Sequence, residues 1–61
     1  MNVVKIDAET RKELRSSMDY LARVEERADV EGKITAGEAG NAVFHLSYMM
    51  DIFNTALKKR A

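Results

Sequence analysis

With 61 residues and a mass of 6.9 kDa, the chain is close to the lower size limit for a domain that folds alone. A compact monomer of this mass buries only about 60 % of its unfolded surface. The absence of cysteine and the single histidine, His45, exclude disulfides, thiolate zinc sites and histidine-rich metal sites. Oligomerisation remains as the means of stabilising so small a chain.

Charge and hydropathy exclude further classes. Ten basic residues balance ten acidic ones, so no net basic field drives non-specific nucleic-acid binding. The apolar runs are too short to span a membrane. Residues 1–6 hold one lysine and no long apolar core, unlike a signal peptide. We therefore expect a cytoplasmic protein with no cofactor.

The first predicted helix covers about residues 8–30. Asp7 is a suitable N-cap because its short side chain can accept a hydrogen bond from a first-turn amide. Gly32 lies where a left-handed C-terminal cap is needed. Apolar residues recur between them at helical spacing and form one stripe, made of Leu14, Met18, Leu21, Val24 and Ala28.

The second predicted helix covers about residues 35–59. Thr35 and Glu38 have the spacing of a capping box, in which each side chain bonds the other residue's amide. The basic residues Lys58, Lys59 and Arg60 suit the negative end of the helix dipole. Two helices of similar length joined by a short loop predict an all-α fold, in which the single domain over residues 1–61 is an antiparallel two-helix hairpin.

The two helices differ in chemistry. The first carries charge along its whole length, whereas the stretch from residue 39 to residue 57 has one formal charge, Asp51. A helical wheel divides the apolar residues of the second helix into two stripes. We expect the broad stripe to face the first helix, and it comprises Ala39, Ala42, Val43, Leu46, Met49, Met50, Phe53, Ala56 and Leu57. The opposite stripe, Phe44, Tyr48 and Ile52, is predicted to be the interface of a homo-oligomeric helical bundle.

The residues offer little for catalysis. Ser16, Ser17 and Ser47 have only His45 as a possible base, and no third group orients it. The acidic cluster Glu25, Glu26 and Asp29 is flanked by arginines, which favours surface ion pairs over a metal site. We therefore expect a non-enzymatic protein without a metal.

A small set of residues is suited to binding an anion or a base. Lys58, Lys59 and Arg60 would be repeated around the symmetry axis of an oligomer and present several cations to phosphate. Arg23 is a further candidate on the first helix. Tyr20 and Tyr48 offer rings for stacking, and His45 offers a hydrogen bond to a base edge. A solvated helix end and packed tyrosines are the simpler interpretation of the same residues.

One segment resembles a known family. Residues Glu38-Ala39-Gly40-Asn41-Ala42-Val43-Phe44-His45-Leu46, then Met49 or Met50, then Asn54-Thr55-Ala56-Leu57, resemble the last helix of the small phage anti-CBASS proteins. With the preceding capping residue Thr35 and the basic end of the helix, the resemblance covers about 24 residues. It implies a homo-oligomer of helical hairpins that sequesters cyclic oligonucleotides between its subunits and so blocks host defence signalling, and a phage-encoded protein of this kind would be located in the host cytoplasm.

Two other functions fit the same architecture. One is a dimeric four-helix-bundle regulator that promotes RNA pairing, although the arginines of the first helix alternate with acidic residues and do not form one basic face. The other is an inhibitor of a host protein.

Overall fold

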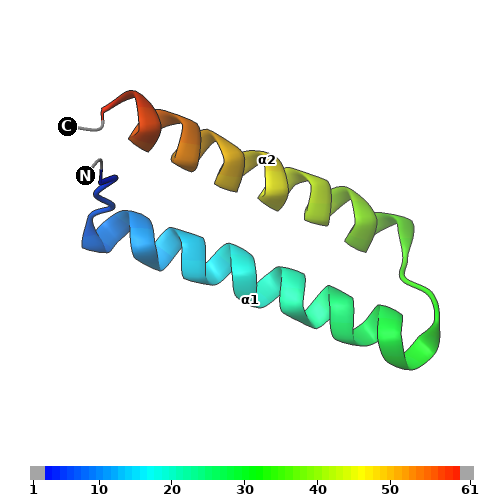
Figure 1. The fold of residues 1–61 in the computed structure, drawn as a ribbon. Coiled ribbons are helices and arrows are strands. Elements are labelled where there is room, and N and C mark those ends of the chain that lie inside the picture. Colours follow the sequence, from blue (N-terminus) through cyan, green and yellow to red (C-terminus); the bar gives the residue numbers. More distant parts are fainter. Residues whose placement is uncertain (1–2, 60–61) are drawn as a thin grey trace.

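The computed structural model describes residues 3–59. Within this range it contains two helices, α1 (Ala8–Glu31) and α2 (Ala36–Lys58), and each boundary lies within one residue of its predicted position. The helices run antiparallel and are joined by a short connection, so that the start of α1 and the end of α2 lie at the same end of the hairpin (Figure 1). The prediction of an all-helical hairpin is confirmed. Neither helix in the described range has an apolar stretch long enough to cross a membrane.

Local hydrogen bonds explain where the helices begin and end. The Asp7 carboxylate accepts from the Thr10 amide at 2.8 Å, and Gly32 ends α1 with a φ of 69°, which glycine adopts without steric cost. At the start of α2 the Thr35 hydroxyl accepts from the Glu38 amide at 3.0 Å, while the Glu38 carboxylate accepts from the Thr35 amide at 2.8 Å. The predicted capping box is therefore present.

These caps make helix stability depend on pH. The bond from the Thr10 amide lowers the pKa of Asp7, and the bond from the Thr35 amide lowers the pKa of Glu38. A carboxylate with a lowered folded-state pKa stabilises the fold at neutral pH and loses this effect as the pH falls through that pKa. Both caps therefore weaken in acid.

Replacing the second N-cap tests its contribution. Thr35→Ala removes the acceptor of the Glu38 amide and is expected to cost about 1 kcal/mol of unfolding free energy, measured by chemical denaturation monitored by circular dichroism. Thr35→Ser keeps the acceptor and is the matched control. An equal loss in both variants would contradict the capping role of the hydroxyl.

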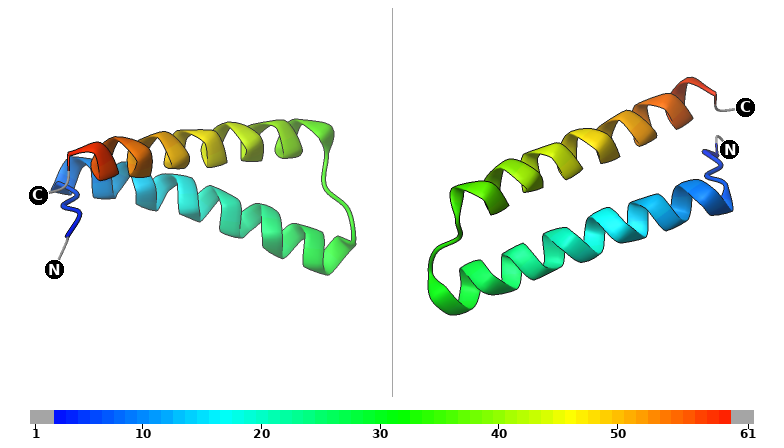
Figure 2. Two further views of the ribbon diagram at one scale, coloured as in Figure 1. Left: turned by 45° about the horizontal axis from the view of Figure 1, so that its top comes forward. Right: turned by 180° about the vertical axis from the view of Figure 1, so that it is seen from behind.

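The helices pack along one seam, called the inner seam below. Buried or partly buried residues recur every three or four positions: Thr10, Leu14, Ser17, Leu21 and Val24 in α1, and Glu38, Ala42, His45, Met49, Ile52 and Ala56 in α2. This heptad-like spacing is typical of antiparallel helices that cross at a small angle. The two helices lie side by side in every view (Figures 1 and 2).

The faces of the helices differ from those that the helical wheel predicts. Five residues of the broad stripe that was expected to face α1 are 44–63 % exposed: Val43, Leu46, Met50, Phe53 and Leu57. Met18, expected in the packed stripe of α1, is 56 % exposed. Ile52, expected on the free stripe, is partly buried and lines a groove with α1 residues. These expectations are wrong because α1 packs at the boundary between the two apolar stripes of α2, where Ser17 and His45 meet.

The single hairpin leaves much of its surface exposed. Within residues 3–59 no apolar side chain is fully buried, and Ser17, at 2 % exposure, is the single fully buried residue. The solvent-accessible area is 5066 Å², about 1,000 Å² more than the roughly 4,000 Å² expected for a compact monomer of this mass. The isolated hairpin therefore lacks a closed hydrophobic core.

Candidate functional site

A hydrogen-bonded pair of polar side chains lies at the middle of the inner seam. The Ser17 Oγ atom is 2.8 Å from His45 Nδ1, so the two groups satisfy each other in the neutral imidazole, whichever of them donates. The small Ser17 side chain leaves room for the imidazole at the facing position. A satisfied polar pair of this kind disfavours other registers of the two helices, because any slip would bury unpaired groups.

Removing one partner of this pair should cost more than removing both. His45→Leu leaves the Ser17 hydroxyl buried without its partner and is expected to lower the unfolding free energy by about 1–3 kcal/mol. In the double variant Ser17→Ala with His45→Leu, both polar groups are gone and part of this loss is recovered. Denaturation midpoints measure both values, and a double variant less stable than His45→Leu would contradict the pairing.

Aromatic and cationic groups surround His45 on one side of the hairpin. The ring of Tyr20 lies 4.8 Å from the imidazole centroid at an angle of 31°, and the Phe44 ring lies edge-on at 5.8 Å. The Arg23 guanidinium carbon is 6.0 Å from the centroid of Tyr20. The structure thus brings together three predicted binding residues, Tyr20, Arg23 and His45, which we call the aromatic cluster. Rings and a guanidinium in this arrangement suit a planar, anionic ligand.

The remaining predicted binding residues lie elsewhere. The hydroxyl of Tyr48 donates to the Glu13 carboxylate, a bond that raises the pKa of Tyr48 because the phenolate has no proton to donate. Tyr48 is therefore occupied by a contact between the helices. Lys58 and Lys59 are at the C-terminal end of α2, away from the aromatic cluster, and Arg60 lies outside the described residues.

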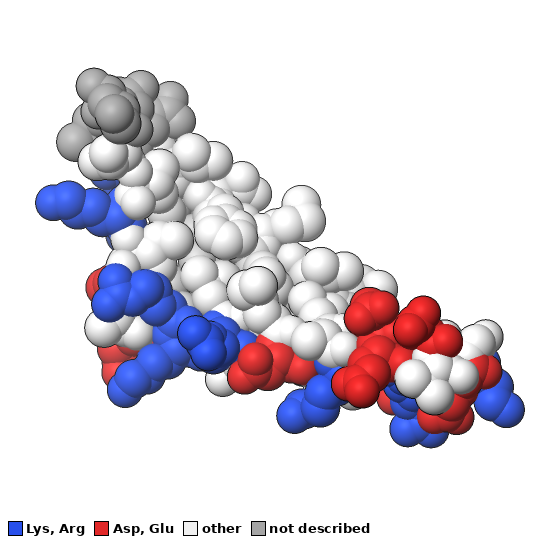
Figure 3. Space-filling model, turned by 60° about the horizontal axis from the view of Figure 1, so that its bottom comes forward, with Lys and Arg blue, Asp and Glu red and all other residues white. Residues whose placement is uncertain are grey.

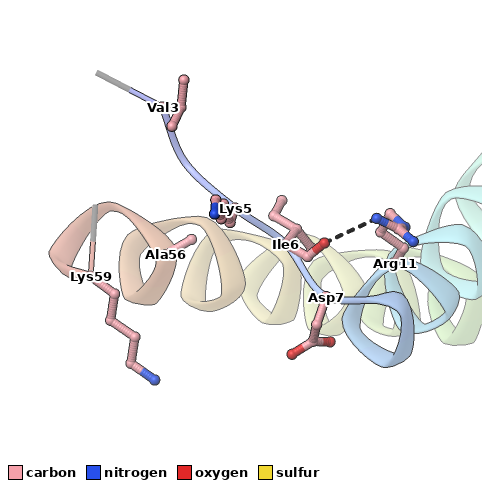
Figure 4. A pocket seen from close by; sticks show the side chains of 7 residues that line it. All are labelled: Val3, Lys5, Ile6, Asp7, Arg11, Ala56 and Lys59. Carbon is pink, nitrogen blue, oxygen red and sulfur yellow. Dashed lines mark hydrogen bonds between the residues drawn. The ribbon is translucent and has the colours of Figure 1, made fainter. Parts of the chain in front are cut away.

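The open end of the hairpin holds a second group of cations. The N-terminal segment and the last turn of α2 enclose a shallow pocket lined by Val3, Lys5, Ile6, Asp7, Arg11, Ala56 and Lys59 (Figure 4). The Arg11 guanidinium donates to the Ile6 carbonyl at 3.2 Å. Sequence reasoning selected Lys59 alone, since no pattern indicates that Lys5 and Arg11 come near it. Asp7 partly neutralises this group, and the positive charges of Arg11 and Lys59 contribute to lowering its pKa.

Within residues 3–59, Ser17 and His45 lack the surroundings of a catalytic serine–histidine pair. Ser17 is 2 % exposed and therefore inaccessible to a substrate, and the partners observed for the His45 ring in this range are Ser17, Tyr20 and Phe44. None of them is a carboxylate that would orient a catalytic histidine. In the same range no three histidine or acidic side chains come together as metal ligands.

An uncharged surface extends along the outside of α2. The residues that directly follow the inner-seam residues of α2 form a second apolar row. We call this row the outer seam, and it comprises Ala39, Val43, Leu46, Met50, Phe53 and Leu57. Its large side chains are between 44 % and 63 % exposed. Of the predicted interface residues, Phe44 is exposed at 67 %, whereas Tyr48 and Ile52 contact or face α1. The outer seam is therefore the main apolar surface that a partner could cover.

No protein family, curated protein or solved structure matches this chain. Function is therefore inferred from the residues of the chain itself, and the resemblance of α2 to the anti-CBASS proteins stays a prediction.

Proposed function

We propose that this chain is a small, non-enzymatic binding protein that acts as a homo-oligomer of helical hairpins and sequesters a cyclic oligonucleotide. The exposed outer seam of α2 is the observation that carries the proposal. A hairpin with no fully buried apolar side chain between residues 3 and 59 gains stability by covering that seam, since burial contributes about 25 cal/mol for each Å² of apolar surface.

The aromatic cluster supports the choice of ligand. A nucleobase can stack on the exposed part of Tyr20 or Phe44, the Arg23 guanidinium can meet a phosphate, and polar groups of a base edge can reach His45. The pockets found on the single hairpin within residues 3–59 are shallow and lie at its open end. Tyr20, Arg23 and Phe44 directly precede inner-seam residues and so lie on the side of the hairpin opposite the outer seam, where a further subunit would have to pack to enclose the ligand. The resemblance of residues 38–57 to anti-CBASS proteins points to the same ligand class, and such a protein would counteract host defence.

Calorimetric titration with a panel of cyclic di- and trinucleotides tests the ligand. We expect saturable heat with at least one of them and a melting temperature that rises with ligand concentration, because the ligand binds only the folded oligomer. Tyr20→Leu removes the stacking ring and should weaken binding about tenfold or more. Arg23→Ala removes the cation that can meet a phosphate and should weaken binding without loss of the oligomer, and Lys12→Ala, on the outer side of α1, is the matched control.

Negative results in the nucleotide titration would point to a different function. Absence of both heat and thermal shift with every cyclic nucleotide would contradict the sequestration proposal. Salt-dependent retention of RNA at low micromolar protein would then indicate an RNA regulator, and absence of that retention would leave a host protein as the partner.

A further inference from the structure

The outer seam repeats the spacing of the inner seam, displaced by one residue. Both run along α2 in steps of three and four, and adjacent positions on a helix differ by about 100°. A helix in a four-helix bundle needs two such apolar faces at roughly a right angle, one for each neighbouring helix. Here α1 covers the inner face, and Met50 and Val43, both 63 % exposed, lie on the free one.

The residues of α1 beside the outer seam carry a symmetric charge pattern. Because the helices are antiparallel, the positions that follow the inner-seam residues in both helices lie on the same side of the hairpin. In α1 these positions are Arg11, Arg15, Met18, Ala22 and Glu25, and Asp29 continues the row four positions further on. Two basic residues therefore precede two small or apolar ones and two acidic ones. Figure 3, a view with α1 brought forward, shows an uncharged surface above a charged edge, with mostly basic groups toward one end of that edge and a group of acidic side chains toward the other.

We propose that a second copy of this chain packs on this side in an antiparallel, two-fold symmetric arrangement, with α1 against α1 along its length. Because Ser17 lies opposite His45, the axis that passes midway between Met18 and Ala22 crosses α2 near Ala42, so α2 meets α2 over its first half, around Val43. Reversing the direction of α1 places Arg15 opposite Glu25 of the second copy and Arg11 opposite Asp29, with Met18 and Ala22 between the two charged pairs. Each contact then occurs twice, as a two-fold axis requires. The proposal rests on the oligomeric state in the proposed function and specifies the interface.

Charge favours this orientation over the other two-fold packing. If α1 lay instead against α2 of the second copy, Arg15 and Glu25 would face apolar residues of the outer seam and lose hydration without gaining a partner. The self-complementary pattern likewise favours a second copy over an unrelated protein.

Charge reversal on the full-length chain tests the orientation. Arg15→Glu places two acidic residues opposite each other at each pair, and Glu25→Arg places two basic ones there. Each variant alone should weaken self-association about tenfold or more at low salt, measured by sedimentation equilibrium. An equimolar mixture of the two variants, or the double variant, should recover the unmodified affinity, because both pairs are again opposite in charge.

Lys12→Glu makes the same charge change on the outer side of α1 and is the matched control. All three positions are exposed, so helix content measured by circular dichroism should be retained at concentrations where the variants associate. The orientation is overturned if the single variants associate as tightly as Lys12→Glu, or if mixing them recovers nothing. A chain that associates as described and binds no nucleotide would contradict the proposed ligand alone.

Discussion

Met50→Asp is expected to separate the oligomer into single chains and to remove most of its helical structure at low micromolar concentration. The substitution places a carboxylate in the middle of the outer seam, where a dry interface would have to bury it without a partner. A hairpin of this length has about 3–9 kcal/mol of stability in total, and association supplies part of it. Sedimentation velocity reports the mass, and far-ultraviolet circular dichroism reports the helix content.

Ser47→Asp provides the control for this result. Ser47 is exposed and lies on the side of α2 opposite α1, at the edge of the outer seam and not at its centre. The same carboxylate there should remain in contact with solvent and change stability by about 0.5 kcal/mol or less. Equal behaviour of Met50→Asp and Ser47→Asp would show that the outer seam is free in solution.

Ile52→Asp should have an effect of similar size for a different reason. Ile52 is partly buried and lines the groove between the helices together with Glu13 and Asp51. A third carboxylate in this groove would lose hydration and be repelled by its neighbours. We expect a loss of about 3 kcal/mol or more in unfolding free energy, measured by urea denaturation at a fixed protein concentration.

Asn54→Asp is the matched control for Ile52, because Asn54 is exposed and on the opposite side of α2. It should leave the denaturation midpoint nearly unchanged. If Ile52→Asp lowered the denaturation midpoint no more than Asn54→Asp does, the inner seam would not include Ile52. Ile52→Val, which removes one methylene, is expected to cost about 1 kcal/mol.

The helices and their ends are predictable because their signals are local. The helix caps form within a few residues of Asp7, Gly32, Thr35 and Glu38. The stretch of α2 with a single formal charge is likewise visible in the sequence. The faces are less predictable, since α2 has apolar residues around most of its circumference. Their spacing shows that two faces exist, but the choice of the inner one depends on the pairing of Ser17 with His45, which are 28 positions apart.

The candidate site is also predictable only in part, because its residue types can be read from the sequence but their proximity depends on how the helices pack. Tyr20, Arg23 and His45 were selected from the sequence as residue types suited to a nucleotide, and their mutual proximity follows from the register of the helices. Tyr48 was selected for the same reason, yet its hydroxyl is taken by Glu13. Lys5 and Arg11 near Lys59 went unpredicted because the N-terminal segment has no periodic pattern that indicates where it turns.

Sedimentation equilibrium of the unmodified full chain at low micromolar concentration, with helix content recorded on the same sample, tests whether the hairpin folds as a homo-oligomer. We expect the helical protein to have a mass that is an even multiple of 6.9 kDa. We also expect helix content and mass to fall together on dilution, because folding and association are linked. A fully helical species of 6.9 kDa, unchanged on dilution, would contradict the homo-oligomer.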